Sequence, residues 1–401
     1  MTATSLSDLS PILKTLYPDG VPLNLVYTDH PLYAMMAKDE TFYGENMKIP
    51  LIYGNPQGRS ASFANAQTNV VGTKSKAFLL TRVSDYAIAQ ISNEAIEAAQ
   101  NNAGAFIETL KLEIDGATKQ AGSSDAQAIW GDGSGVIGRF ASTVDVQALS
   151  GVLSDPEQIV NFEVGQVLCL SALTTGSVRS GTLTVSAIDR SSGTLTFSGS
   201  IVAGVGAAAP SDYLSVQGDF GSKMSGIAAW LKGTNVTSAA FFGVDRTSDK
   251  TRLAGHVGDY SAYPIEEAVI EALRRIARDG GNPDMIFMNY AKYAAFEKAL
   301  GSKVHYVDLK GPASVAFRGI EINGPKGVVK ILADQSCPSN TMAVLQMNTW
   351  KLRSLKASVR ILDLDGNKML RVSNSDSVEI RVGGYKQVSC NAPGWNGLFT
   401  I

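Results

Sequence analysis

The sequence predicts an α+β protein made of several modules. Three features predict this class. One long amphipathic helix pattern covers residues 91–121, short strand patterns rich in Gly, Ser and Thr fill 141–220, and helices alternate with strands from residue 221. With 401 residues, of which 44% are hydrophobic, the chain is long enough for two or three domains with a buried core.

The composition favours surfaces that meet other protein over surfaces that bind nucleic acid. Charged residues make up only 18% of the chain, and the formal net charge is −2. Tight nucleic-acid binding needs concentrated Lys and Arg to displace counterions from phosphate. The three cysteines, Cys169, Cys337 and Cys390, are odd in number and far apart, so we expect neither a disulfide framework nor a zinc site.

The first 84 residues predict two extended segments. Residues 1–40 contain several prolines and one short helical turn, PLYAMM, and predict an N-terminal arm. Residues 41–84 predict a long two-stranded loop, because strand patterns at 42–52 and 76–90 flank the polar stretch YGNPQGRSASFANAQ. That stretch offers almost nothing to bury, so it predicts either a disordered linker or an arm that packs on another molecule.

The clearest helix lies within the next segment, 85–140. From Ser92 the apolar residues recur at steps of three or four, which predicts a helix over 91–121. Ser92 can cap its start and Gly122 can end it. We expect a bend at the patch from Asn101 to Gly104, where helix propensity is poor.

Three further modules complete the chain. Residues 141–220 predict an inserted small β-barrel or sandwich, and 221–348 predict an α/β domain with helices at PIEEAVIEALRRIARDGG and YAKYAAFEKALG. Residues 349–401 predict closing β-strands, with a hairpin turn at Asp365-Gly366.

No motif assembles a catalytic, cofactor or metal site. Gly133-x-Gly135-x-x-Gly138 has dinucleotide-type spacing, but a helix precedes it and no periodic helix follows, so a plain glycine loop is the better interpretation. The segment from Asp363 to Asn367 lacks the later ligands of a calcium loop. His30, His256 and His305 are isolated, and the chain has no nucleophile elbow and no phosphate loop. We therefore expect no enzyme activity, no cofactor and no metal.

The order of these elements resembles the major capsid proteins of tailed bacteriophages, of the Hong Kong 97 type. FYGENMKIPLIYGNPQGRSASF through SKAFLLTRVSDYAIAQISNEAIEAA resembles the extended loop of that family feeding its spine helix. MSGIAAWL resembles the entry to the axial domain, and GGNPDMIFMNYAKYAAF resembles a strand-to-helix stretch within it. The resemblance covers nearly the whole chain and rests on layout, because the family has no short signature. The 141–220 insertion departs from the minimal fold.

The resemblance implies a structural protein that self-assembles into an icosahedral shell around double-stranded DNA. It implies hexamers and pentamers of this chain, contacts with portal and possibly scaffolding or decoration proteins, no membrane partner, and a virion location after synthesis in the host bacterial cytoplasm. We expect neighbouring subunits to contact the extended loop and the N-terminal arm. The loop residues are Tyr53, Pro56, Arg59, Phe63, Asn69, Lys74 and Lys76, and the arm residues are Leu13, Tyr17 and Leu25.

Some members of that family cross-link their loops covalently through a Lys–Asn isopeptide bond. Lys74 and Lys76 lie on the loop, and Asn391 and Asn396 lie near the C-terminus, but nothing in the sequence aligns them as a reactive pair. Two other functions stay open at this stage: an encapsulin-type nanocompartment shell, and an enzyme with a β-barrel accessory domain. The gene neighbourhood would separate the three.

Overall fold

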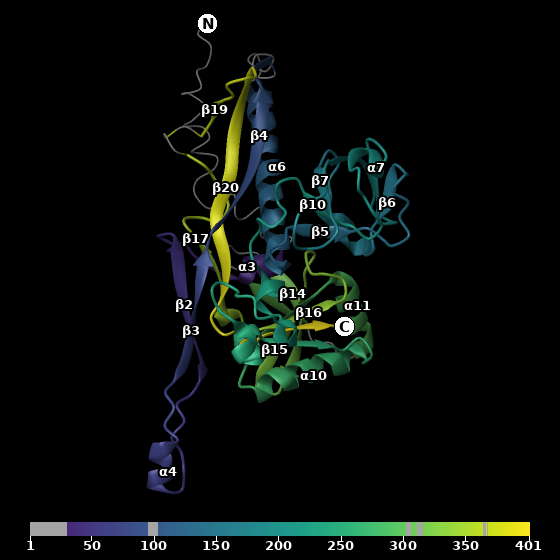
Figure 1. Ribbon diagram of the computed structural model, residues 1–401. Coiled ribbons are helices and arrows are strands. Elements are labelled where there is room, and N and C mark those ends of the chain that lie inside the picture. The colour runs from purple at the N-terminus through teal and green to yellow at the C-terminus, as the bar shows by residue number, and fades with distance from the viewer. Residues whose placement is uncertain (1–29, 95–102, 302–305, 311–315, 364–365, 367) are drawn as a thin grey trace.

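The computed structural model describes residues 30–94, 103–301, 306–310, 316–363, 366 and 368–401. It contains an elongated sheet backed by a long helix, a second sheet flanked by two helices, a small ring of strands to one side, and a two-stranded hairpin that projects from the body (Figure 1). The mixed α and β composition predicted from the sequence is confirmed.

The elongated sheet is organised around β20 (Ser377–Cys390). On one side β4 (Val83–Ser92) runs antiparallel to it over ten residue pairs. The other side of β20 pairs with three shorter strands, β17 (Trp350–Ser354), β18 (Arg360–Ile361) and β19 (Leu370–Arg371). Strand β1 (Ala37–Asp39) runs parallel to β17 on the far side of β17 from β20. Of the expected hairpin at Asp365-Gly366, Asp365 lies outside the described residues, and β18 and β19 each pair with β20.

The long helix runs past its predicted end. Helix α6 spans Ala103–Trp130. Ser92 ends β4, and Asn93 and Glu94 directly after it are helical, where the sequence predicts the helix to start. Residues 95–102, which include Asn101 of the predicted bend, lie outside the described part. Gly122 does not stop the helix, because the next turns bury Ala126, Ile129 and Trp130 in the largest core cluster. A helical glycine costs only about 1 kcal/mol, which this packing outweighs. Ile114, Ala117 and Ala121 pack on β4 and β20.

The second sheet has seven strands with helices α10 (Ile265–Arg278) and α11 (Tyr290–Leu300) packed on it. Its order is β11 (His256–Asp259), β21 (Gly397–Thr400), β16 (Thr341–Leu345), β12 (Met285–Met288), β15 (Gly327–Ala333), β14 (Ala316–Gly324) and β13 (Tyr306–Lys310). The sequence assigned all of 349–401 to the closing strands. Instead β21 lies inside this sheet, where its main chain bonds to β11 and β16 on both sides and Phe399 is buried.

The side module is a closed six-stranded ring. Its order is β5 (Val136–Arg139), β10 (Tyr213–Val216), β7 (Val167–Ser171), β8 (Leu183–Asp189), β9 (Thr194–Phe197) and β6 (Ser150–Val152). A bridge between Phe140 and Leu153 joins the last strand to the first, which removes both free edges. The sequence placed this module at 141–220, whereas the ring begins at Val136 because β5 pairs with β10.

Short helical elements lie within and between these bodies. They are α3 (Pro31–Met35), α4 (Phe63–Thr68), η1 (Pro156–Asn161), α7 (Ile201–Gly204), α8 (Ile227–Trp230), η2 (Gly233–Asn235), η3 (Arg246–Ser248), α9 (Lys250–Ala254), η6 (Met347–Thr349) and η7 (Pro393–Trp395).

Residues 30–39 belong to the core of their own chain, although the sequence assigned 1–40 to an arm. The predicted helical turn is present as α3, with Leu32, Tyr33 and Ala34 buried. The Leu32 amide donates to the buried Asp334 carboxylate at 3.0 Å. Strand β1 then pairs with β17. Removing these apolar side chains from water stabilises the packed position of residues 30–39, which is why this segment does not extend as an arm.

Replacing Asp39 by Asn is expected to lower the free energy of unfolding by about 1–2 kcal/mol at pH 7. This is less than the roughly 1.5–3 kcal/mol of a hydrogen bond to a charged group, because the Asn carbonyl still accepts a hydrogen bond. The carboxylate accepts hydrogen bonds from Thr41 and pairs with the Arg353 guanidinium across the sheet. The Thr41 hydroxyl first, and Arg353 after it, hold the pKa of Asp39 below its ordinary 3.8.

A lowered carboxyl pKa stabilises the fold above the unfolded value, and this stabilisation disappears as the pH falls through the folded value. The difference between the natural chain and Asp39→Asn should therefore shrink as the pH falls below 3.8. Urea unfolding of the unassembled subunit at pH 7 and pH 3 measures it. An equal difference at both pH values would contradict the ionic explanation.

Candidate interaction surface

A two-stranded hairpin is the most exposed part of the described chain. Strands β2 (Asn46–Gly54) and β3 (Lys74–Thr81) pair from Asn46–Thr81 to Gly54–Lys74, and a further bridge joins Gln57 to Val71. Helix α4 closes the far end (Figure 1). The two strands predicted at 42–52 and 76–90 are confirmed, with β3 and β4 dividing the second, and α4 was not predicted.

The base of the hairpin is anchored in the core of the body. Alternate side chains Ile49, Leu51, Phe78 and Leu80 are buried, which is the two-residue period of a strand with one packed face. The Phe78 ring meets the Trp230 indole edge-on, with ring centroids 5.0 Å apart. This packing fixes the direction in which the rest of the hairpin leaves the body.

Polar contacts to residues 242–252 reinforce the base. The Leu79 amide donates to the Phe242 carbonyl at 2.9 Å. The Lys76 ammonium donates to the Ser248 hydroxyl at 2.8 Å, and the Arg252 guanidinium donates to the Tyr53 carbonyl at 2.7 Å. The predicted contact residues Tyr53 and Lys76 thus lie where the hairpin leaves the body and already bond within their own chain.

Beyond this base the hairpin buries nothing. No residue from Ile52 to Ala77 is buried, and Phe63 and Val70 are 80% and 68% exposed. Ile52 and Val71 are also exposed. Several exposed apolar groups on one projecting element make it a candidate interaction site.

The other predicted loop residues lie on this distal part. Pro56, Arg59, Phe63, Asn69 and Lys74 are all exposed, and Asn69 ends α4 by donating its amide to the Asn65 carbonyl at 3.0 Å. The predicted arm residues Leu13, Tyr17 and Leu25 lie outside the described residues.

The hairpin carries positive charge only. Residues 46–81 contain Lys48, Arg59, Lys74 and Lys76 and no Asp or Glu. The first three are exposed and form no ion pair with any residue that the structure describes. A partner of opposite charge would therefore be attracted to the distal hairpin.

The glycine motif at 133–138 has a packing role. A Cβ at Gly135 would lie 2.3 Å from the Asp219 carbonyl oxygen, and a Cβ at Gly138 would lie 2.8 Å from the Phe162 ring. The segment enters strand β5 and not a helix, so the plain-loop interpretation is confirmed.

The described residues assemble no recognisable reaction chemistry. They contain no group of three or more His, Cys, Asp and Glu that could hold a metal ion. His30 and His256 are buried at separate places, and all three cysteines are free and buried. Asn396 is buried and accepts from the Trp350 indole at 2.9 Å, so it is not presented for a Lys–Asn bond. Among the helices described, none is both long and apolar enough to cross a membrane.

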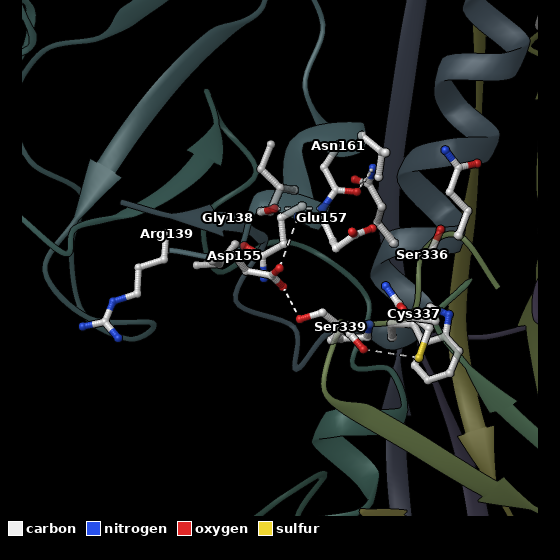
Figure 2. Close-up of a pocket in the computed structure, with 18 of the residues that line it drawn as sticks. Gly138, Arg139, Asp155, Glu157, Asn161, Ser336, Cys337 and Ser339 are labelled. Atoms are coloured by element: carbon white, nitrogen blue, oxygen red, sulfur yellow. Dashed lines mark hydrogen bonds between the residues drawn. The ribbon is translucent and has the colours of Figure 1, made fainter. Parts of the chain in front are cut away.

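A cleft of about 310 Å³ separates the six-stranded ring from the body (Figure 2). Asp155 at the start of η1 accepts a hydrogen bond from Ser339 of the body at 2.6 Å across it. Glu157 and Asn161 of η1 line one wall, and Ser336 and Cys337 line the other. Burial raises the pKa of the Cys337 thiol well above 9.0, so this thiol is not an activated nucleophile.

A lysine clamp holds the ring on its other side. The Lys223 ammonium contacts the carboxylates of Asp85 at 2.8 Å and Asp219 at 3.1 Å, and it donates to the Ser124 hydroxyl at 2.7 Å. The clamp thus connects the segment that follows the last strand of the ring, residues 217–225, to both β4 and α6. Sequence reasoning missed it, because its members lie up to 138 positions apart.

Comparison with known proteins gives one family match. The family model of the SU10 major capsid protein matches residues 206–366. No curated protein matches the chain in sequence.

Several solved structures are similar in arrangement. The chain is 10% identical to a chain of the cyanophage A-1(L) capsid asymmetric unit, with 93% of each chain covered and a TM-score of 0.49. For a Mycobacterium phage Bobi structure the identity is 9%, the coverage 100% and 99%, and the TM-score 0.41. For the holo-SrpI encapsulin complex from Synechococcus elongatus the identity is 8%, the coverage 97% and 94%, and the TM-score 0.44.

Proposed function

We infer that this chain is the structural major capsid protein of a tailed bacteriophage, and its surfaces are interpreted from that premise. The match of residues 206–366 to the family model of a major capsid protein carries this conclusion. The function is structural, and the chain is not an enzyme.

We further propose that the elements of this chain have the arrangement of a Hong Kong 97-type capsid protein. The hairpin of β2 and β3 corresponds to the extended loop, α6 to the spine helix, and the seven-stranded sheet with α10 and α11 to the axial domain. The six-stranded ring is the inserted domain. The elongated sheet around β20 forms the peripheral domain.

In this assignment each subunit completes its neighbours. The distal hairpin, which buries no residue on its own chain, lies across an adjacent subunit with Pro56, Arg59, Phe63, Asn69 and Lys74 in contact. Exchanged contacts of this kind are individually weak and add up through the number of copies. Repeated contacts between different surfaces close into hexamers and pentamers, and these into a shell around double-stranded DNA.

Other components follow from the same assignment. The shell would contact a portal complex, and scaffolding or decoration proteins would be its further partners. The chain is made in the cytoplasm of the bacterial host and ends in the virion. A net charge of −2 suits a container that holds DNA without binding a particular sequence.

Negative-stain electron microscopy of the purified protein, paired with light scattering, tests the proposal. We expect closed particles, or rings of five and six subunits. A chain that stays monomeric both alone and when produced with its neighbouring phage structural genes would contradict the proposal. Genome-length DNA inside particles from infected cells separates the phage shell from an encapsulin, whose particles would hold a protein cargo.

A further inference from the structure

The inserted ring carries a surface that complements the distal hairpin. Residues 136–216 contain six acidic residues and three arginines, a net charge of −3, and no lysine. The arginines are engaged: Arg179 pairs with Asp212, Arg190 pairs with Glu163, and Arg139 lies over the Tyr213 ring. The surface that remains is acidic, whereas the hairpin is basic.

Four acidic residues of the ring are exposed, Asp145, Glu157, Glu163 and Asp189, and two of them lie on one segment, residues 156–164. Ile159 and Phe162 turn inward and are buried in the core of the ring. Glu157, Val160, Glu163 and Val164 are exposed, and we call these four residues the η1 face. Glu157 and Val160 also line the cleft between the ring and the body. Glu157 forms no ion pair with any described residue. The face thus combines an unpaired carboxylate with two exposed valines.

The distal hairpin shows the matching pattern. Arg59 has no ion-pair partner within the described chain, and Phe63 and Val70 are exposed close to it in sequence. The hairpin and the ring of one subunit lie on different sides of its body, with the tip directed away from the ring (Figure 1). The hairpin therefore cannot reach the η1 face of its own chain, and a second copy must supply one of the two surfaces.

A second landing surface competes with the η1 face. The outer face of β4 exposes Tyr86 and Ile88. The carboxylate of Glu379, opposite Gln90 of β4, is already paired with Arg381. On the outer face of β4, Arg59 of the hairpin would meet a carboxylate that already has a partner. On the η1 face it would meet the unpaired Glu157, so complementarity of charge favours the η1 face.

We propose that the hairpin tip of one copy docks on the η1 face of the inserted ring of a neighbouring copy, with Arg59 against Glu157 and with Phe63 and Val70 against Val160 and Val164. The proposal rests on the proposed function and names the surface that receives the extended loop. The ring would then act as an assembly contact that every subunit offers to the next.

Disulfide trapping between two single-cysteine variants tests this contact. The three native cysteines are buried, so the engineered thiols react with little background. Arg59→Cys and Glu157→Cys chains are purified separately, mixed, assembled and oxidised. We expect a cross-linked dimer from the mixture and none from either variant alone. The competing surface is tested in parallel with Ile88→Cys.

The outcomes separate this proposal from the proposed function. Assembled particles in which Arg59→Cys links to Ile88→Cys and not to Glu157→Cys would overturn the docking surface and leave the capsid function intact. Particles that form without either link would overturn it as well. A natural chain that forms no particles, either alone or when produced with its neighbouring phage structural genes, would overturn the capsid function itself.

A charge exchange gives an independent readout. Arg59→Glu alone and Glu157→Arg alone should each lower the yield of closed particles about tenfold, because the same loss is repeated at every copy. A chain that carries both changes can form the same ion pair with the charges exchanged. If the two residues interact, the yield of this double variant should return to within about threefold of the natural chain. A double variant no better than the singles would overturn the pairing.

Discussion

A chain that lacks the hairpin tip is expected to fold normally and to form no closed particles. In the variant, an Asn-Gly turn replaces residues 58–70 between Gln57 and Val71. The Gln57 amide donates to the Val71 carbonyl at 2.9 Å and the Val71 amide donates back at 2.6 Å, which is the pair that a two-residue turn requires. None of the removed residues is buried, so the free energy of unfolding should change by less than about 0.5 kcal/mol.

Light scattering and electron microscopy measure the loss of particles, and urea unfolding checks the fold. A second variant keeps the length and replaces residues 58–70 by a Gly-Ser segment, which removes the side chains while preserving the connection. It should fail to assemble in the same way. Normal particles from either variant would show that the distal hairpin is dispensable, and a large loss of stability would show that it packs on its own chain.

Replacing Lys386 by Met is expected to lower the free energy of unfolding by about 3–5 kcal/mol, the usual cost of leaving one partner of a buried ion pair alone. The side chains of Lys386 and Asp125 are 1% and 0% exposed, and the ammonium bonds to the Asp125 carboxylate. Tyr33 donates to the same carboxylate at 3.3 Å, and Lys386 also donates to the Ser358 carbonyl at 3.0 Å. Without the ammonium, the buried carboxylate loses its charged hydrogen-bond donor and keeps the longer bond from Tyr33.

The loss in Lys386→Met should depend on pH. Burial raises the pKa of Asp125 to about 6, although Lys386 opposes the rise. A raised carboxyl pKa means that the folded state binds the proton more tightly, so this group favours folding at low pH and that contribution disappears as the pH rises through the folded value. Removing Lys386 raises this pKa further. The variant should therefore lose more stability at pH 8 than at pH 5.

Two further variants check the explanation. Lys356 is exposed, and Lys356→Met should cost less than about 0.5 kcal/mol, which controls for the loss of a lysine. Adding Asp125→Asn to Lys386→Met removes the unpaired charge and should recover most of the loss. A pH-independent loss, or no recovery in the double variant, would show that packing and not charge dominates.

Local patterns in the sequence predicted the elements that depend on neighbouring residues. Helix α10 has its apolar stripe, its early glutamates and its late arginines within one segment, and it forms where that segment predicts. The same holds for β12, whose four residues are all buried. The hairpin was predicted from composition, because a stretch without large apolar residues has nothing to pack with.

The errors concern contacts between distant residues. Gly397–Thr400 is too short to show a period, and only its pairing with β11 and β16 places it in the second sheet. The end of α6 was placed at Gly122 because the apolar partners of Ile129 and Trp130 come from other elements of the core. Helix α4 buries no residue, so it carries no stripe that a sequence pattern could detect. The η1 face was missed because exposure on a closed ring cannot be inferred from sequence alone.

The way the ring joins the body makes it a natural attachment point for foreign domains. Its two connections meet at the bridge between Asp132 and Ser225, and the Gly226 amide donates to the Gly131 carbonyl at 3.1 Å. In a fraction of the copies, a guest domain whose own ends lie close together could replace the ring there without stretching α6 or α8, while the natural copies keep the η1 face. Each modified copy would then display one guest at a fixed place on the proposed shell.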